Sequence, residues 1–216
     1  MDFDLIWTLL PRYLHATQLT VGLTLEALFF GLVGGLVMAL MKMSKSKLMS
    51  GIASVYISII RGTPLLLQII FVYYSLPAVG ITLGPFEAGV FALSINEIAY
   101  MAETFRSGIQ AIDKGQTEAA KTLGYSKFTT MLLIILPQAV KIIIPTIGNM
   151  SVSMIKDTSL VSTISIAELL RSAQTSYATT FKPVETYLLA GLIYYALSCL
   201  MSFVFKKTEK RMSVVN

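Results

Sequence analysis

The stretch ATQLTVGLTLEALFFGLVGGLVMALM, residues 16–41, is apolar apart from Glu26 and a few hydroxyl and amide side chains. It is long enough to cross a membrane as a helix, since a hydrocarbon core of about 30 Å takes roughly 20 apolar residues. Gly31, Gly34 and Gly35 are small residues of the kind that let membrane helices approach one another closely. The stretch therefore predicts a transmembrane helix that packs tightly against a neighbour.

The composition of the whole chain agrees with a membrane protein. Of its 216 residues 55% are hydrophobic and 13% are charged, and the mean hydropathy is +0.71. These values exclude a soluble globular domain and predict one membrane domain over residues 1–216. The net charge of +5 resides mainly between apolar runs, which favours loops at a membrane surface over a nucleic-acid partner.

Five apolar runs predict an all-α membrane protein with five transmembrane helices. The second run is too long for one straight crossing and is interrupted at Arg61-Gly62-Thr63-Pro64, where proline disfavours helix in the residue before it. The fourth run contains Pro137 and Pro145 and is predicted to be kinked or broken. The five runs cover residues 16–41, 51–78, 88–105, 128–150 and 186–205.

The positions of Lys and Arg predict the orientation. With five crossings, the loop at 42–50, the loop at 106–127 and the C-terminal tail share one face, and they hold 11 of the 17 basic residues, against four on the other face. Because positive charge favours the cytoplasmic side, we expect the N-terminus outside and the C-terminus in the cytoplasm. An odd number of helices cannot be halved into an inverted pair, so a two-fold pathway requires a second chain.

A polar stripe lies on the third predicted span. Asn96, Tyr100 and Glu103 are spaced to fall on one helix face, and Glu97 lies about 100° around the helix. An ionisable residue at the centre of a membrane helix costs about 2.5 to 3.5 kcal/mol, so these carboxylates are expected to face a polar cavity or a partner. Two interpretations of these carboxylates remain: they contact the substrate, or they pair with other residues within the membrane.

The cytoplasmic stretch that follows contains a spaced pattern. Glu118-Ala119-Ala120 is followed after three residues by Gly124, and then after nine residues by Ile134-Ile135-Leu136-Pro137. This spacing resembles the coupling motif of the membrane subunits of ATP-binding-cassette (ABC) importers. The small alanines suit close docking of a surface helix, Glu118 suits a cap or a pair with a basic group, and Gly124 suits a sharp turn.

The resemblance extends over about residues 17–206, to the polar amino-acid permeases for histidine, glutamine, arginine and cystine. Glu97 after Asn96 and Ser107 are modest departures from the family pattern. The segments that carry the likeness are Arg61-Gly62-Thr63-Pro64-Leu65, Asn96, Ala99-Tyr100, Ala102-Glu103, Phe105-Arg106-Ser107-Gly108-Ile109, Lys114-Gly115-Gln116, Pro137-Gln138-Ala139 and Lys156-Asp157-Thr158-Ser159-Leu160.

The resemblance implies a multi-pass permease subunit in a bacterial cell (inner or cytoplasmic) membrane. It implies a dimer with itself or a close paralogue, two copies of a separate ABC ATPase subunit, an extracytoplasmic solute-binding protein and an amino-acid substrate. A coupling helix between the third and fourth spans, around residues 112–125, would contact the ATPase through Glu118, Ala119, Ala120 and Gly124, with Pro137 in the same motif. The chain has no G-x-x-x-x-G-K-[ST] sequence, which is consistent with ATP hydrolysis on another subunit.

An unpaired carboxylate in a cavity of low dielectric is tolerated mainly when it meets a cation or a proton. Glu97 therefore favours a substrate with an extra cationic group, such as arginine, lysine, histidine or cystine, over glutamine or glutamate, which remain the alternative. Lys156 and Asp157 offer one positive and one negative charge to an amino-acid substrate. An equally weighted alternative is that they form a salt-bridged turn outside the membrane. The candidate substrate-binding residues are Arg61, Asn96, Glu97, Tyr100, Glu103, Lys156, Asp157 and Ser159.

Two other function classes are weighed against the permease. An ion-coupled secondary transporter could use Glu97 and Glu103, but it gives no reason for the pattern from Glu118 to Pro137. A membrane enzyme would need a metal or nucleophile constellation, and the single His15, the single Cys199 and the absence of H-E-x-x-H do not supply one. The sequence thus predicts a transport subunit without catalytic residues, metal or cofactor.

Overall fold

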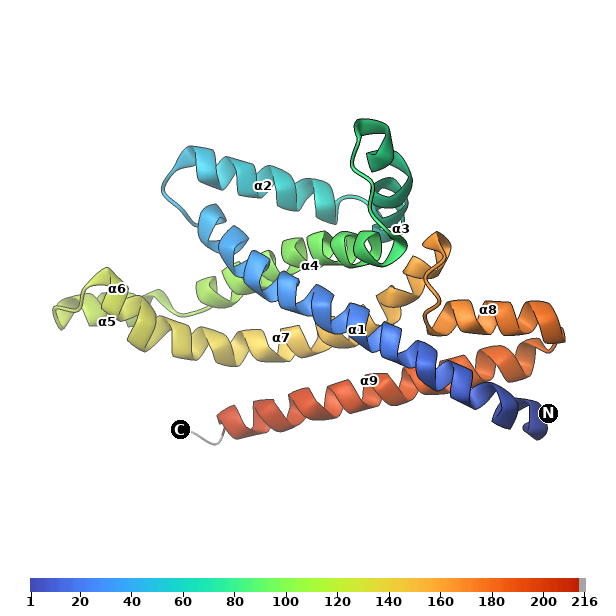
Figure 1. Cartoon of the computed structure of the whole chain (residues 1–216). Helices are drawn as coiled ribbons and strands as arrows, with labels where there is room; N and C mark the ends of the chain where they lie inside the picture. Colours follow the sequence, from blue (N-terminus) through green and yellow to red (C-terminus); the bar gives the residue numbers. More distant parts are fainter. Residues whose placement is uncertain (214–216) are drawn as a thin grey trace.

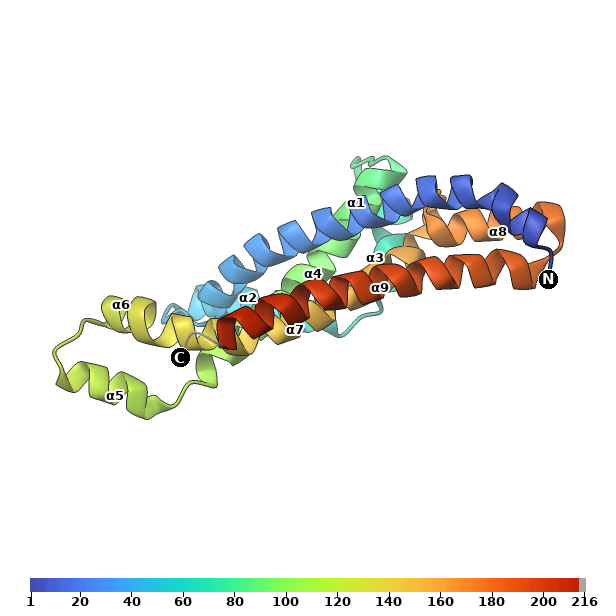
Figure 2. The ribbon, with the colours of Figure 1, turned by 90° about the horizontal axis from the view of Figure 1, so that it is seen from below.

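The computed structural model describes residues 1–213, which are almost entirely helical. The long helices α1 (Phe3–Lys42) and α9 (Pro183–Ser213) run along the length of the molecule (Figures 1 and 2). The short helices α5 (Lys114–Thr122) and α6 (Lys127–Thr130) lie at one end. The N-terminus and α8 (Leu169–Thr180) lie at the opposite end.

Helix α1 begins well before residue 16, where the first apolar run starts. Asp2 caps it, since its carboxylate accepts a hydrogen bond from the backbone N–H of Leu5 at 3.0 Å. Leu9 and Tyr13 are buried against α8 and α9, so tertiary packing stabilises helix where the sequence is mixed. Forty residues make a helix of about 60 Å at 1.5 Å per residue, roughly twice the thickness of a hydrocarbon core.

The central packing of the fold is α1 against α4 (Pro85–Gln110). Gly31, Gly34 and Gly35 lie where α1 meets Glu97, Ile98 and Met101 of α4, and a Cβ at any of the three would overlap those side chains. The close approach predicted from these glycines is therefore present. The main core joins this helix pair to the segment 65–76 and to α7 (Leu136–Asp157), with Leu23, Leu93 and Ile164 fully buried.

The break at residues 61–64 is present as predicted. Helix α2 (Lys47–Arg61) ends at Gly62, and Pro64 precedes α3 (Leu65–Ile70). The chain continues in a π-helical turn, Phe71–Ser75, and a 3-10 turn, Leu76–Val79, which ends at Gly80 with a positive φ of 85°. The two halves meet at an angle of 103°, so this segment is a bent pair and not one straight crossing (Figure 1).

The fourth apolar run forms a longer helix than predicted, and it is irregular near the first of its two prolines only. A π-helical turn, Met131–Ile135, joins α6 to α7, and a 3-10 turn, Thr158–Ile164, follows α7. The irregular turn lies just before Pro137, while α7 continues through Pro145 without interruption. Lys156 and Asp157 are therefore the last two residues of α7. The sequence alone left open that they form a turn outside the membrane.

Glu168 connects α8 to α9 at the end opposite α5. Its carboxylate is fully buried, caps α8 by accepting from the N–H of Arg171 at 2.8 Å, and accepts from the Tyr194 hydroxyl at 2.5 Å. Beyond the other end of α8, Lys182 donates to the Asp2 carboxylate, and this hydrogen bond holds the pKa of Asp2 below its usual value. The start of α1 is therefore held next to α9 by polar contacts as well as apolar ones.

Three helices in residues 1–213 are long and apolar enough to cross a membrane by themselves: Phe3–Lys42, Lys127–Ile164 and Pro183–Met212. The bent pair α2 and α3 would make a fourth if it counts as one span. Helix α4 has the length for a crossing but carries Glu87, Glu97, Glu103 and Arg106. The all-helical membrane fold agrees with the sequence, and five crossings with the N-terminus outside remain a prediction.

Candidate functional site

A cavity of about 480 Å³, called here the Glu97 cavity, lies between the helix break, α4 and α7. Four of the candidate substrate-binding residues, Asn96, Glu97, Tyr100 and Asp157, line it together. Amide, hydroxyl and carboxylate groups alternate with apolar ones in its wall. Its other lining residues are Thr63, Pro64, Leu65, Thr146, Asn149, Met150, Ser153 and Leu160.

Glu97 has an unusual position in this cavity. Its residue is 5% exposed, and its Oε1 atom has no hydrogen-bond partner among residues 1–213. Gly31 of α1 lies against the stem of the Glu97 side chain, where a Cβ would overlap it. Asp157 lines the same cavity from the last turn of α7, so two acidic residues on different helices face one space. A buried carboxylate beside a second acidic residue favours a cationic ligand or a bound proton.

Asn96 lines the Glu97 cavity and also holds the helix break in place through hydrogen bonds. Its side-chain amide donates to Gln68 Oε1 at 3.0 Å, and Gln68 Nε2 donates to the carbonyl of Ile60 at 2.8 Å and to Thr63 Oγ1 at 2.9 Å. These bonds connect α4 to the residues on both sides of the break. Gln68 is buried and was not a candidate from the sequence, because one glutamine in an apolar run has no local signal of its own.

Of the cavity wall on α7, only Asp157 was predicted from the sequence. Thr146, Asn149, Ser153 and Asp157 line the Glu97 cavity at steps of three or four residues. That spacing places them on one face of a helix. A polar stripe of this period within an apolar run is a signal that could have found them.

The remaining candidates lie elsewhere. Glu103 forms ion pairs with Lys42 of α1 and with Arg106, whose Nη2 is 2.7 Å from its Oε2. The sequence left open whether Glu103 contacts substrate or pairs within the membrane, and the structure shows the pairing. Arg61 lies over the Tyr100 ring, 5.1 Å from its centroid. Lys156 is exposed, and neither it nor Ser159 lines the Glu97 cavity.

The predicted coupling segment forms α5 and the turn that follows it. Asp113 caps α5 by accepting from the N–H of Gly115 at 2.7 Å, while Glu118 lies exposed within the helix and does not cap it. Gly124 has a φ of 80°. The N–H of Tyr125 donates to the Ala120 carbonyl at 3.0 Å, a bond of the Schellman motif that needs such a residue.

The exposed surface of this segment is partly apolar. Ala120 is buried within the chain, so of the two alanines only Ala119 is available to a partner. Leu123 is 75% exposed and Phe128 is 76% exposed. Gln138, in the first turn of α7, donates to the Ile134 carbonyl at 2.7 Å and approaches Gln116 Oε1 at 3.4 Å. This contact joins α5 to the first turn of α7, the helix that lines the Glu97 cavity, and Pro137 lies in the same turn.

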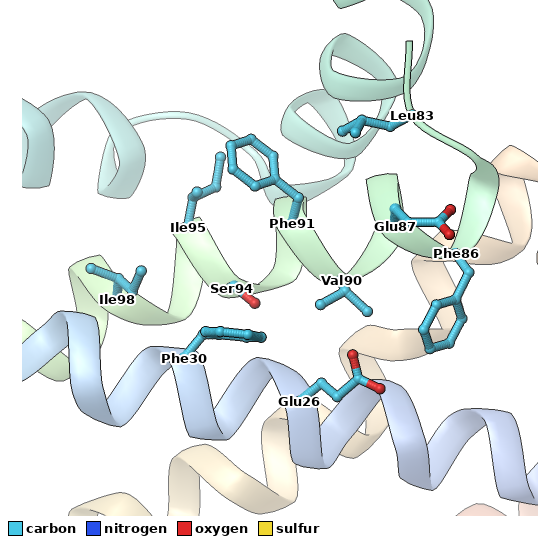
Figure 3. A pocket seen from close by; sticks show the side chains of 10 residues that line it. All are labelled: Glu26, Phe30, Leu83, Phe86, Glu87, Val90, Phe91, Ser94, Ile95 and Ile98. Atoms are coloured by element: carbon cyan, nitrogen blue, oxygen red, sulfur yellow. The ribbon is translucent and has the colours of Figure 1, made fainter. Parts of the chain in front are cut away.

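Another cavity, called here the Phe30 cavity, measures about 440 Å³ and lies between α1 and α4 (Figure 3). Glu26 and Glu87 contribute carboxylates to it, and Phe30 and Phe91 contribute rings, but most of its lining is apolar. It therefore offers a zwitterion fewer partners than the Glu97 cavity. Within residues 1–213 no group of three His, Cys, Asp or Glu side chains is arranged to hold a metal ion.

The chain is similar over nearly its whole length to characterised transport proteins. It is 38% identical over 213 residues to the arginine transport system permease protein ArtQ of Bacillus subtilis, covering 98% of this chain and 97% of that one. It is 41% identical over 194 residues to the L-cystine transport system permease protein TcyB of the same organism, covering 89% and 83% of the two chains. The glutamine transport system permease protein GlnP of Escherichia coli is 33% identical over 216 residues and covers 99% of both.

Solved structures agree. The chain matches the crystal structure of an amino acid ABC transporter with histidines at 40% identity and a TM-score of 0.93, covering 98% of this chain and 99% of that one. A methionine ABC transporter, MetNI, in an inward-facing conformation shares the fold, with a TM-score of 0.79 at 17% identity. Residues 31–214 match the family described as binding-protein-dependent transport system inner membrane component. The chain belongs to this family of membrane permease subunits.

Proposed function

We propose that the chain is the permease subunit of an ABC importer for polar amino acids and that its preferred substrate carries an extra cationic group. The observation that carries the substrate class is the buried Glu97 carboxylate, whose Oε1 atom has no hydrogen-bond partner among residues 1–213, in a cavity shared with Asp157. The transport class is supported by relatives whose names state arginine, cystine and glutamine transport.

The two acidic residues suit the two cationic groups of such a substrate. In this proposal Asp157 takes the α-ammonium group, and Glu97 takes the side-chain guanidinium or ammonium group. A charge-assisted hydrogen bond to each is stronger than a neutral one, which offsets the cost of removing the ligand from water. Thr146, Asn149 and Ser153 supply further polar partners along α7.

The single membrane domain over residues 1–216 crosses the membrane five times in this proposal, with the C-terminus inside. Two permease chains enclose the pathway, and each α5 docks on one of two ATPase subunits. Exposed Leu123 and Phe128 on both sides of the Gly124 turn are suited to such a contact, since exposed apolar side chains often mark interfaces. ATP-driven movement of α5 would reach the Glu97 cavity through α7. An extracytoplasmic binding protein would deliver the substrate from the other side.

The experiment is uptake into liposomes that contain the permease with its ATPase and binding protein. Labelled arginine, lysine, histidine and cystine are compared with glutamine and glutamate at equal concentration. The proposal expects ATP-dependent uptake of at least one of the first four and weaker uptake of the last two. Preference for glutamine would support the alternative substrate class, and ATP-independent uptake driven by an ion gradient would support a secondary transporter.

A further inference from the structure

A second polar cavity lies next to the first. It measures about 460 Å³ and is called here the Arg61 cavity. It lies between the end of α1, the second half of α2 and the middle of α4, on the side of the Glu97 cavity toward Lys42 and Glu103. Its lining residues are Lys42, Ser54, Ile57, Ser58, Arg61, Gly62, Tyr100 and Glu103.

The charge of this cavity is opposite to that of the first. Its acidic residue, Glu103, forms ion pairs with both Lys42 and Arg106. One negative charge therefore faces two positive charges. Arg61 adds a guanidinium group that forms no ion pair with any residue of 1–213. The Glu97 cavity, in contrast, contains Glu97 and Asp157 and no basic residue. The two cavities therefore present charges of opposite sign to a ligand.

The two cavities are adjacent and share part of their lining. Tyr100 lines both cavities. The helix break is shared between them, since Arg61 and Gly62 face one cavity while Thr63 and Pro64 face the other. Arg61 lies over the Tyr100 ring with its Cζ atom 5.1 Å from the centroid. A cation–π contact does not neutralise the guanidinium group, so its N–H donors can still bind a carboxylate.

We propose that the Arg61 cavity is a second binding subsite for the transported amino acid, in which Arg61 binds the substrate carboxylate after the molecule has passed Tyr100. The inference rests on the proposed function, because it assumes that an amino acid occupies the Glu97 cavity first. An arginine side chain is suited to bind a carboxylate, because its planar guanidinium group can donate two parallel hydrogen bonds to the two carboxylate oxygens. A volume near 460 Å³ lies within the range of small-molecule sites.

The test measures the charge preference of each cavity without using transport. Cys199 is the single native cysteine and is replaced by alanine, after which Ser58→Cys reports on the Arg61 cavity and Ser153→Cys on the Glu97 cavity. The permease–ATPase complex is treated with an anionic and a cationic methanethiosulfonate reagent of similar size. Ser58→Cys should react faster with the anionic reagent, and Ser153→Cys with the cationic one.

Removing the guanidinium group should change one cavity only. Arg61→Gln should lower the ratio of anionic to cationic reaction rates at Ser58→Cys by about tenfold, as expected when one charge is removed three residues away on the same helix, at roughly 6 Å. Arg61→Lys should keep most of the ratio, which separates lost charge from misfolding. The ratio at Ser153→Cys should stay unchanged in both variants. An unchanged ratio at Ser58→Cys in Arg61→Gln would overturn the assignment.

Ligand protection tests the carboxylate directly. Arginine should slow modification at both cysteines, whereas agmatine, which is arginine without its carboxylate, should protect Ser153→Cys and not Ser58→Cys. Protection of Ser153→Cys by arginine without any protection of Ser58→Cys would overturn the second subsite and leave the proposed function intact. Absence of protection by arginine at both cysteines would contradict the proposed arginine-type site and the subsite together.

Discussion

The side-chain amide of Asn96 donates to Gln68 Oε1 at 3.0 Å, joining the middle of α4 to α3 beyond the helix break. Both residues are buried, and the amide of Gln68 is used in turn by the Ile60 carbonyl and Thr63. The polar groups that a broken helix leaves open are thus satisfied by side chains. Because Thr63, Pro64 and Asn96 also line the Glu97 cavity, the same bonds define its shape.

Asn96→Leu should destabilise the protein by about 1 to 3 kcal/mol, because it leaves Gln68 Oε1 buried without a donor. Gln68→Leu should cost a similar amount, and the double variant should cost less than the two single costs added together, since the two residues share one bond. The measurement is thermal unfolding in detergent. Ser94→Ala is the matched control on α4, because the buried Ser94 Oγ has no hydrogen-bond partner among residues 1–213. Equal shifts for Asn96→Leu and Ser94→Ala would contradict this account.

Gly31→Ala should lower uptake by displacing Glu97, because the added Cβ would overlap the Glu97 side chain where α1 meets α4. Overpacking of this kind costs about 1 to 3 kcal/mol. Gly22→Ala on the same helix is the control, since a Cβ there has no neighbour within 4 Å. Initial uptake rates are compared at equal amounts of inserted protein. The contact is unimportant for transport if the two variants behave alike.

Gly124→Val should uncouple transport from ATP hydrolysis while leaving the protein inserted. A β-branched residue at a φ of 80° is strained by about 1 to 3 kcal/mol, which would unwind the end of α5. Gly124→Asn should keep most activity, because asparagine tolerates the left-handed conformation. The measurement is ATPase activity stimulated by substrate-loaded binding protein. Normal stimulation in Gly124→Val would show that this turn does not matter for docking.

The predicted orientation can be tested by labelling in the Cys199→Ala background. Cysteines at Lys45 and Gln116 should react with an impermeant reagent only from the cytoplasmic side, and a cysteine at Thr82 only from outside. The reason is the excess of basic residues in the loops that contain Lys45 and Gln116. Labelling of Gln116→Cys from outside would rule out the five-crossing topology.

Local sequence signals predicted the parts of the fold that depend on backbone chemistry. Pro64 and Gly124 restrict or permit particular backbone angles wherever they occur, so the break after α2 and the turn after α5 could be located from the residues alone. The early start of α1 could not, because Leu9 and Tyr13 are helical there through packing on α8 and α9, which are far away in the sequence.

The candidate site divides in the same way. Asn96, Glu97 and Tyr100 could be found as polar residues on one apolar helix, and Asp157 as an acidic residue next to a lysine. The pairing of Glu103 with Lys42 joins residues 61 positions apart, and the bond from Asn96 to Gln68 joins residues 28 apart. Periodicity within one helix gives no information on which residues of another helix it meets. The division into two cavities of opposite charge therefore required the fold.

The central claim is that the Glu97 carboxylate recognises a cationic group of the transported amino acid. The most direct measurement is the ratio of arginine uptake to glutamine uptake in liposomes for the wild type, Glu97→Gln and the control Glu26→Gln, which changes an acidic residue of the Phe30 cavity. Loss of one charged hydrogen bond, worth about 1.5 to 3 kcal/mol, should lower the ratio by roughly 10- to 100-fold in Glu97→Gln. The ratio in Glu26→Gln and the basal ATPase activity of both variants should stay close to the wild type. A wild type that carries glutamine best, with a ratio indifferent to Glu97→Gln, would contradict the account.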